Sequence, residues 1–153
     1  MSALRGSPPN MGVLSLAIQE SRSLLDLPND WDDEGSPGYA ESTWTRAVDF
    51  LLQNAERLWQ DQGVEVSAPA ILPGPDGSID LHWRTKNHEL LLTIPADADG
   101  LADYYGDTVD ANAVSGKLNT SARNQWLLMW LAEYMRWQLR GCHDMIEATG
   151  ILR

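Results

Sequence analysis

Residues 74–94 read GPDGSIDLHWRTKNHELLLTI, a stretch that predicts an antiparallel β-hairpin. The turn is expected at Pro75-Asp76-Gly77, because proline presets one backbone angle and Asp-Gly tolerates positive φ. The next residues alternate between apolar and polar, as in a half-buried strand. The apolar members are Ile79, Leu81 and Trp83. A second turn at 86–87 leads into an apolar strand over 90–94. Strands joined by such short turns pair antiparallel, so the stretch predicts a meander.

Further strands are expected on both sides of this hairpin. Residues 70–72 form a short strand before the first turn, and residues 101–105 are a candidate for a fourth strand. The stretch 107–119 contains Gly116 and many small or polar residues, which favours a loop. The sequence therefore predicts a sheet of three or four strands.

Apolar residues at helical spacing predict three helices. The first covers residues 11–27 and ends before Pro28. The second begins after Ser42, a candidate N-cap, and stops at Gly63. Its apolar face consists of Trp44, Ala47, Val48, Leu51, Leu52, Ala55, Leu58 and Trp59. The third spans about residues 122–140.

Together these elements predict a single α+β domain. We expect an antiparallel three- to four-stranded β-meander with two long helices packed on one face and a short N-terminal helix. A chain of 153 residues has the common length of one domain. Residues 1–10 lack periodicity and contain two prolines, so we predict a flexible N-terminal tail and a domain over residues 11–153.

The net charge of −11 limits the possible partners. Binding to nucleic-acid phosphates needs clustered Lys and Arg, whereas the eleven basic residues here are scattered, so this mode is not expected. The charge is consistent with plain solubility, with an acidic cytosolic proteome, or with a surface that meets a basic protein partner or mimics nucleic acid. No apolar run approaches the roughly 18 residues of a membrane span. The single cysteine, Cys142, fits a reducing compartment, and we expect a cytoplasmic protein.

The segment 29–39 is the most unusual part of the chain, because it packs four acids between glycines and prolines. The acids are Asp30, Asp32, Asp33 and Glu34. Three explanations are open: a structural loop in which Trp31 plugs the core, a partner contact, or a hard cation bound by oxygen ligands. The acid spacing does not match an EF-hand, and we predict no metal site. The acids between residues 97 and 110 predict a solvated turn.

A second candidate site lies on the polar face of the predicted strand 79–84. Asp80, His82 and Arg84 share this face, so an acid–base pair is geometrically possible there, with Tyr105 lining the same groove. The sequence has no zinc-ligand spacing, phosphate loop, dinucleotide glycine pattern or nucleophile elbow. We therefore expect no cofactor, and the sequence favours a non-enzymatic role.

Four segments carry a resemblance to a known family. They are WDDEGSPGY within residues 27–51, PDGSIDLHW at 75–83, YYGD within residues 90–107, and LLMWL at 127–131. This combination resembles a family of small, uncharacterised bacterial proteins, which have a Trp-Asp-x-(Glu)-Gly loop before a helix, a hairpin ending in Leu-x-Trp, and a Tyr-Gly-Asp segment. The resemblance implies a free-standing bacterial module from accessory or defence-related gene neighbourhoods. It implies no catalytic residues.

We therefore predict a non-enzymatic protein-interaction module of a bacterial system, antitoxin-like, immunity-like or defence-associated, that presents an acidic surface containing Trp and Tyr. Its predicted contact residues are Trp31, Asp32, Asp33, Glu34, Tyr39, Tyr104, Tyr105 and Asp107. The alternative is a small-molecule or nucleotide-related enzyme or sensor that uses the face around Asp80, His82 and Arg84. The partner's identity and the oligomeric state stay open.

Overall fold

The computed structural model describes residues 6, 11–84, 88–108 and 111–121. Its helical elements are α1 (Met11–Ser21), the 3₁₀ turn η1 (Arg22–Asp26), α2 (Glu41–Gln62) and the 3₁₀ turn η2 (Pro75–Gly77). The helix predicted over residues 11–27 thus forms as α1 continued by η1. The helix predicted near residues 122–140 and most of the predicted N-terminal tail lie outside the described residues.

The two ends of α2 test the predicted caps. The N-cap is Ala40, which is extended and makes no side-chain cap hydrogen bond, so the prediction of Ser42 is wrong. An acid, Glu41, occupies the first turn, where the helix dipole favours negative charge. The predicted stop is confirmed, because Gly63 adopts the left-handed conformation with φ 64° and its N–H caps α2.

The sheet has five antiparallel strands in the order β1-β2-β3-β4-β5. They are β1 (Ala70–Pro73), β2 (Ile79–Arg84), β3 (His88–Ile94), β4 (Ala102–Thr108) and β5 (Ala111–Leu118). The α+β class and the antiparallel meander are confirmed, with one strand more than predicted. That strand, β5, replaces most of the loop expected at 107–119. Its small and polar residues give no strand signal of their own, and pairing with β4 supplies the order.

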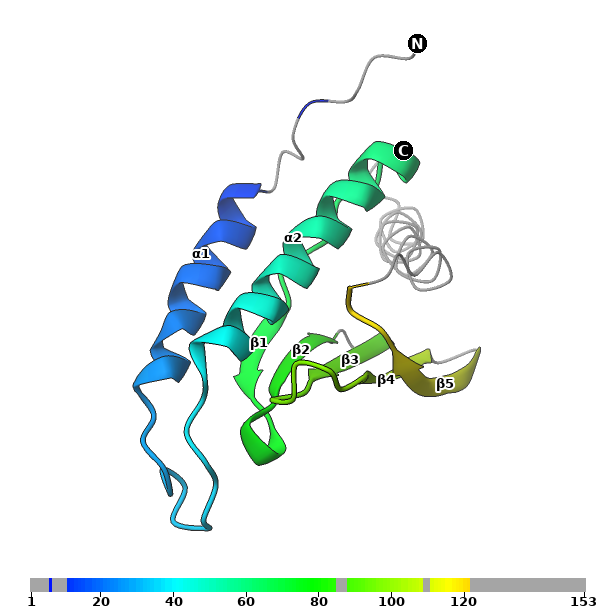
Figure 1. The fold of residues 1–153 in the computed structure, drawn as a ribbon. Coiled ribbons are helices and arrows are strands. Elements are labelled where there is room, and N and C mark those ends of the chain that lie inside the picture. The colour runs from blue at the N-terminus through cyan, green and yellow to red at the C-terminus, as the bar shows by residue number, and fades with distance from the viewer. Residues whose placement is uncertain (1–5, 7–10, 85–87, 109–110, 122–153) are drawn as a thin grey trace, which may run out of the picture.

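The helices and the sheet form two layers, and the alternation of side chains along the strands gives the sheet two different faces. In Figure 1, α2 crosses one face of the sheet, with α1 alongside α2. The helix α2 contacts β2 and β3, and α1 contacts β1. We call the face of the sheet towards α2 the inner face and the opposite face the outer face. None of the helices in the described part of the chain is long and apolar enough to cross a membrane.

The core lies between α2 and the inner face. The strands contribute the buried side chains of Ile79, Leu81, Trp83, Leu90, Leu92 and Ile94. From α2, Ala47, Phe50, Leu51, Ala55 and Leu58 are buried, together with the polar Thr43 and Asn54. Asn54 is satisfied by donating to the carbonyl of Phe50 at 2.7 Å. The buried face of α2 therefore differs from the predicted one. The prediction left out Phe50, which is buried, and included Trp44 and Trp59, which are only half-buried.

Candidate functional site

The outer face of the sheet gathers polar side chains from four strands. Period-two alternation and the register of the strands place these residues on it. They are Asp80, His82 and Arg84 of β2, Glu89 and Thr93 of β3, Asp103, Tyr105 and Asp107 of β4, and Ser115 and Lys117 of β5, and the apolar Leu91 of β3 lies among them. All are exposed or half-buried, so no element of the described chain covers this face fully. The structure thus places the predicted alternative site, Asp80, His82 and Arg84, on the same face as Tyr105, with the strand β3 between them.

Cross-strand hydrogen bonds occupy the end of the outer face nearest the β1–β2 turn. The hydroxyl of Thr93 donates to Oδ1 of Asp80 at 2.8 Å, and Nζ of Lys117 lies 2.6 Å from Oδ1 of Asp103. The second pair is well exposed on both sides, so its contribution to stability is small. These contacts bind neighbouring strands to one another.

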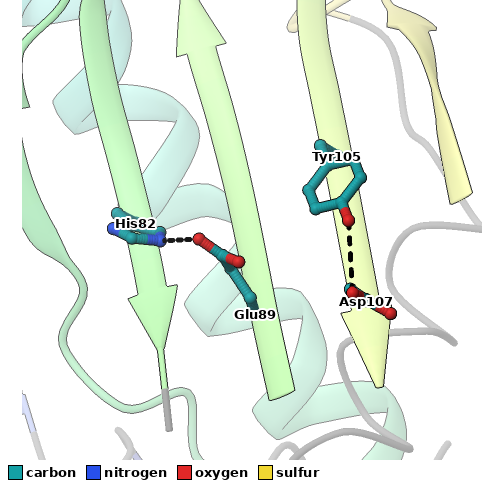
Figure 2. A network of polar contacts seen from close by, with 4 residues as sticks. All are labelled: His82, Glu89, Tyr105 and Asp107. Carbon is teal, nitrogen blue, oxygen red and sulfur yellow. Dashed lines mark hydrogen bonds and ion pairs between the residues drawn. The ribbon is translucent and has the colours of Figure 1, made fainter. Parts of the chain in front are cut away.

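A second polar group lies further along the same strands. Figure 2 shows His82 of β2 directed towards Glu89 of β3, and Tyr105 of β4 above Asp107 on the same strand. Nε2 of His82 lies 2.7 Å from Oε1 of Glu89. The hydroxyl of Tyr105 donates to Oδ2 of Asp107 at 3.2 Å. The first pair joins an imidazole to a carboxylate and the second joins a phenol to a carboxylate, and both lie on the outer face.

The environment of Tyr105 is negative. Its hydrogen bond to Asp107 raises the pKa of the phenol, and the charges of Asp107 and Glu89 act in the same direction. The side chain stays accessible, with 39% of Tyr105 exposed. Leu91, directly opposite on β3, is half-buried. An aromatic and an aliphatic side chain therefore lie in the middle of the outer face, next to carboxylates.

Sequence reasoning missed Glu89. The sequence predicts an apolar strand over 90–94, whereas β3 begins at His88 and its burial alternates over residues 89–94. The predicted hairpin could have identified Glu89, because a short turn at 86–87 pairs Arg84 with Glu89. This register places Glu89 diagonally opposite His82.

The acidic loop over residues 29–39 is held by its own carboxylates. The carboxylate of Asp30 accepts from the N–H of Gly35 at 2.7 Å. That of Asp32 accepts from the N–H of Glu34 at 3.0 Å and from the hydroxyl of Ser36. The hydrogen bond from Ser36 is the largest cause of a lowered pKa at Asp32, opposed in part by desolvation and aided by backbone N–H groups. Asp33 and Glu34 are exposed.

The two aromatic residues of this loop point to the core. Tyr39 is only 8% exposed, and its hydroxyl donates to the carbonyl of Gly74 at 2.9 Å. The half-buried ring of Trp31 lies 6.2 Å from that of Tyr39, centroid to centroid. This corrects the prediction of Tyr39 as a contact residue, since burial removes it from the surface. Trp31, also predicted as a contact residue, packs against the core, as the structural explanation of the loop describes.

The predicted contact residues of β4 divide between the two faces. Tyr105 and Asp107 lie on the outer face, whereas Tyr104 lies on the inner face. The ring of Tyr104 packs over Gly116 of β5 so closely that a Cβ at Gly116 would meet the Tyr104 hydroxyl at 2.7 Å. The eight predicted contact residues therefore do not form one surface, because adjacent strand residues point in opposite directions.

A separate cavity of about 380 Å³ lies between α2, the β3–β4 loop and the end of β5. Its polar lining includes Asp49, Asp99 and Asn119. Arg46, which also lines it, donates to the carbonyls of Pro95 at 2.8 Å and Ala96 at 3.0 Å. Arg46 thereby ties the β3–β4 loop to α2.

The described residues contain no group of three His, Cys, Asp or Glu side chains placed to hold a metal ion. The acids at 97–100 form a turn, in which the N–H of Asp99 and the N–H of Gly100 bond to the carboxylate and the carbonyl of Asp97.

Comparisons with known proteins identify no relative: no family model, no curated protein and no solved structure matches the chain.

Proposed function

We propose that this protein is a non-enzymatic interaction module, of an antitoxin-like, immunity-like or defence-associated kind, that binds a basic partner protein through the outer face of its sheet. The observation that carries the proposal is the exposed Tyr105 beside half-buried Leu91, in the middle of a face with four carboxylates. Exposed tyrosines that become buried dominate many protein interfaces.

The charge of the outer face supports a basic partner. Asp80, Glu89, Asp103 and Asp107 oppose two permanent cations, and one of these, Lys117, is paired with Asp103. The chain as a whole carries −11, so approach of a basic surface is favoured at long range. The exposed Asp33 and Glu34 of the acidic loop add to this field.

The test is comparative affinity capture from the native host, followed by calorimetry with the purified partner. Wild type and Val13→Ser should retain one stoichiometric basic protein, whereas Tyr105→Ala should weaken it by about 2 kcal/mol, as truncation of a hot-spot tyrosine does. Val13 is the matched control, because it is 62% exposed on α1, away from the outer face. Capture of no stoichiometric partner, or equal binding by Tyr105→Ala and Val13→Ser, would contradict the proposal.

The second candidate function is a small-molecule or nucleotide-related enzyme or sensor. The specific observation in its favour is the 2.7 Å contact between His82 and Glu89, since a carboxylate can orient an imidazole as an acid–base group. Against it, the described cavity lies near Arg46 and Asp49, away from this pair. Nuclear magnetic resonance titration with a panel of nucleotides decides the matter. Shifts confined to residues around His82, and lost in His82→Gln, would favour a sensor or enzyme.

A further inference from the structure

Among the residues that the structure describes, β5 is the last strand of the sheet and its outer edge pairs with no further strand. Within the described chain β5 pairs only with β4, and no further backbone hydrogen bond joins it to another described segment. In an antiparallel pair, every second residue directs its N–H and C=O away from the neighbouring strand. Ala113, Ser115, Gly116 and Lys117 are all exposed. Such an edge is a template for one more strand.

The opposite edge of the sheet, formed by β1, is better protected than β5 against pairing with a further strand. The strand β1 has four residues, ends at Pro73, and has α1 packed beside it. Short length, proline and a covering helix are the usual means by which proteins block edge pairing. The strand β5 has eight residues and no proline. It does carry two weaker obstacles to edge pairing, Lys117 and a register irregularity opposite Gly106–Thr108, and the irregularity leaves residues 114–118 as its regular part.

The charge of β5 fits a second copy of the same chain. The sequence contains 22 acidic residues, but none lies in Ala111–Leu118, where Lys117 is the single charged residue. Two copies that each carry −11 repel one another over most of their surfaces. A strand without carboxylates is where two such chains can approach backbone to backbone.

We propose that β5 pairs antiparallel with β5 of a second copy, about a two-fold axis at Ser115, and joins two five-stranded sheets into one. In this register Gly116 faces the partner copy's Val114, and Lys117 faces the partner copy's Ala113. Registers centred on Gly116 or Lys117 would instead oppose glycine to glycine or lysine to lysine, which lose packing or add repulsion. The Tyr104 ring that covers Gly116 then packs beside the partner copy's Val114, an aromatic–β-branched pair.

Sedimentation velocity on the full chain, from micromolar to millimolar concentration, tests the dimer. We expect a reversible dimer that high salt strengthens, because salt screens the like net charges. Ser115→Lys puts two like charges opposite one another and should raise the dissociation constant by about tenfold or more at low salt. Ala70→Lys is the matched control, since Ala70 is exposed on the other edge strand, and it should leave the dimer intact.

A crosslinking experiment tests the register. In a Cys142→Ser background, Ser115→Cys should form a disulfide-linked dimer on mild oxidation, because facing Cα atoms of an antiparallel pair lie about 4.5–5.5 Å apart, a separation that a disulfide spans. Ala70→Cys should remain largely uncrosslinked. Circular dichroism checks that each variant is folded. A wild type that is monomeric at millimolar concentration, or equal effects of the changes at Ser115 and Ala70, would overturn the proposal. It needs no partner protein, so it stands or falls independently of the proposed function.

Discussion

At the residue scale, the acidic loop illustrates how carboxylates can be structural without a metal. Asp30 and Asp33 adopt positive φ angles of 60° and 59°, which aspartate tolerates better than most residues. The carboxylates of Asp30 and Asp32 accept backbone N–H groups within the loop. Hydrogen bonding of the carboxylates therefore accounts for two of the four acids, and leaves Asp33 and Glu34, which are exposed as Asp30 is, without this explanation.

The lowered pKa of Asp32 makes a prediction about pH. Since the pKa of Asp32 in the folded protein lies below its ordinary value, the ionised carboxylate contributes stability above that ordinary value. The contribution is lost as pH falls through the lowered pKa. Asp32→Asn should therefore melt below wild type at neutral pH, with the difference shrinking under acid conditions. Thermal unfolding followed by circular dichroism across this range measures it, and a pH-independent difference would count against the assignment.

The buried hydroxyl of Tyr39 gives a second prediction. Tyr39→Phe removes the donor to the Gly74 carbonyl and leaves that acceptor unpaired, so the free energy of unfolding should fall by about 1 kcal/mol. Tyr105→Phe is the control, because its exposed hydroxyl should matter by less than about 0.5 kcal/mol. Urea denaturation measures both. Equal effects would mean that Tyr39 does not hold the loop to the β1–β2 turn.

At the element scale, secondary structure here has two different origins. The helix α2 and the strand β2 follow from local periodicity, since their buried residues repeat at helical and period-two spacing. The strand β5 has no such pattern, and its order comes from the backbone groups of β4. A strand of this second kind cannot be predicted from its own residues, because its order depends on the strand with which it pairs.

The C-terminus of α2 makes a prediction with a built-in control. Gly63 has φ 64°, so Gly63→Ala should destabilise the fold by roughly 1 kcal/mol. Gly12 lies within α1, and an added Cβ there meets nothing within 4 Å. Gly12→Ala should therefore stabilise the protein by about 0.5 kcal/mol or more. Opposite signs in chemical denaturation are expected, and the same sign for both would refute the capping argument.

At the scale of the whole molecule, stability depends on one core closed by α2 against the inner face. Leu92, at the centre of the middle strand β3, is fully buried, while Leu72 on β1 is 42% exposed. Arg46 adds a polar link across the same boundary, because it holds the carbonyls of Pro95 and Ala96 to α2. The outer face makes no comparable contact within the described chain, which leaves it open to a partner.

The difference in burial between Leu92 and Leu72 predicts how far each substitution lowers the free energy of unfolding. Leu92→Ala should reduce the free energy of unfolding by about 2–5 kcal/mol, the range for a buried leucine that leaves a cavity. Leu72→Ala should cost less than about 0.5 kcal/mol. Denaturation by urea compares the two, and a small effect of Leu92→Ala would mean that the inner face is not the closed core.

The amino-acid sequence by itself determined the α+β class, the β1–β2–β3 meander, the C-terminal end of α2 and the membership of Asp80, His82 and Arg84 in one face. Each follows from local turn chemistry or periodicity. Only the tertiary structure decided the existence of β5, the burial of Tyr39, the separation of Tyr104 from Tyr105, and the contact between His82 and Glu89. These depend on strand register and on packing between segments distant in the chain, which no local pattern encodes.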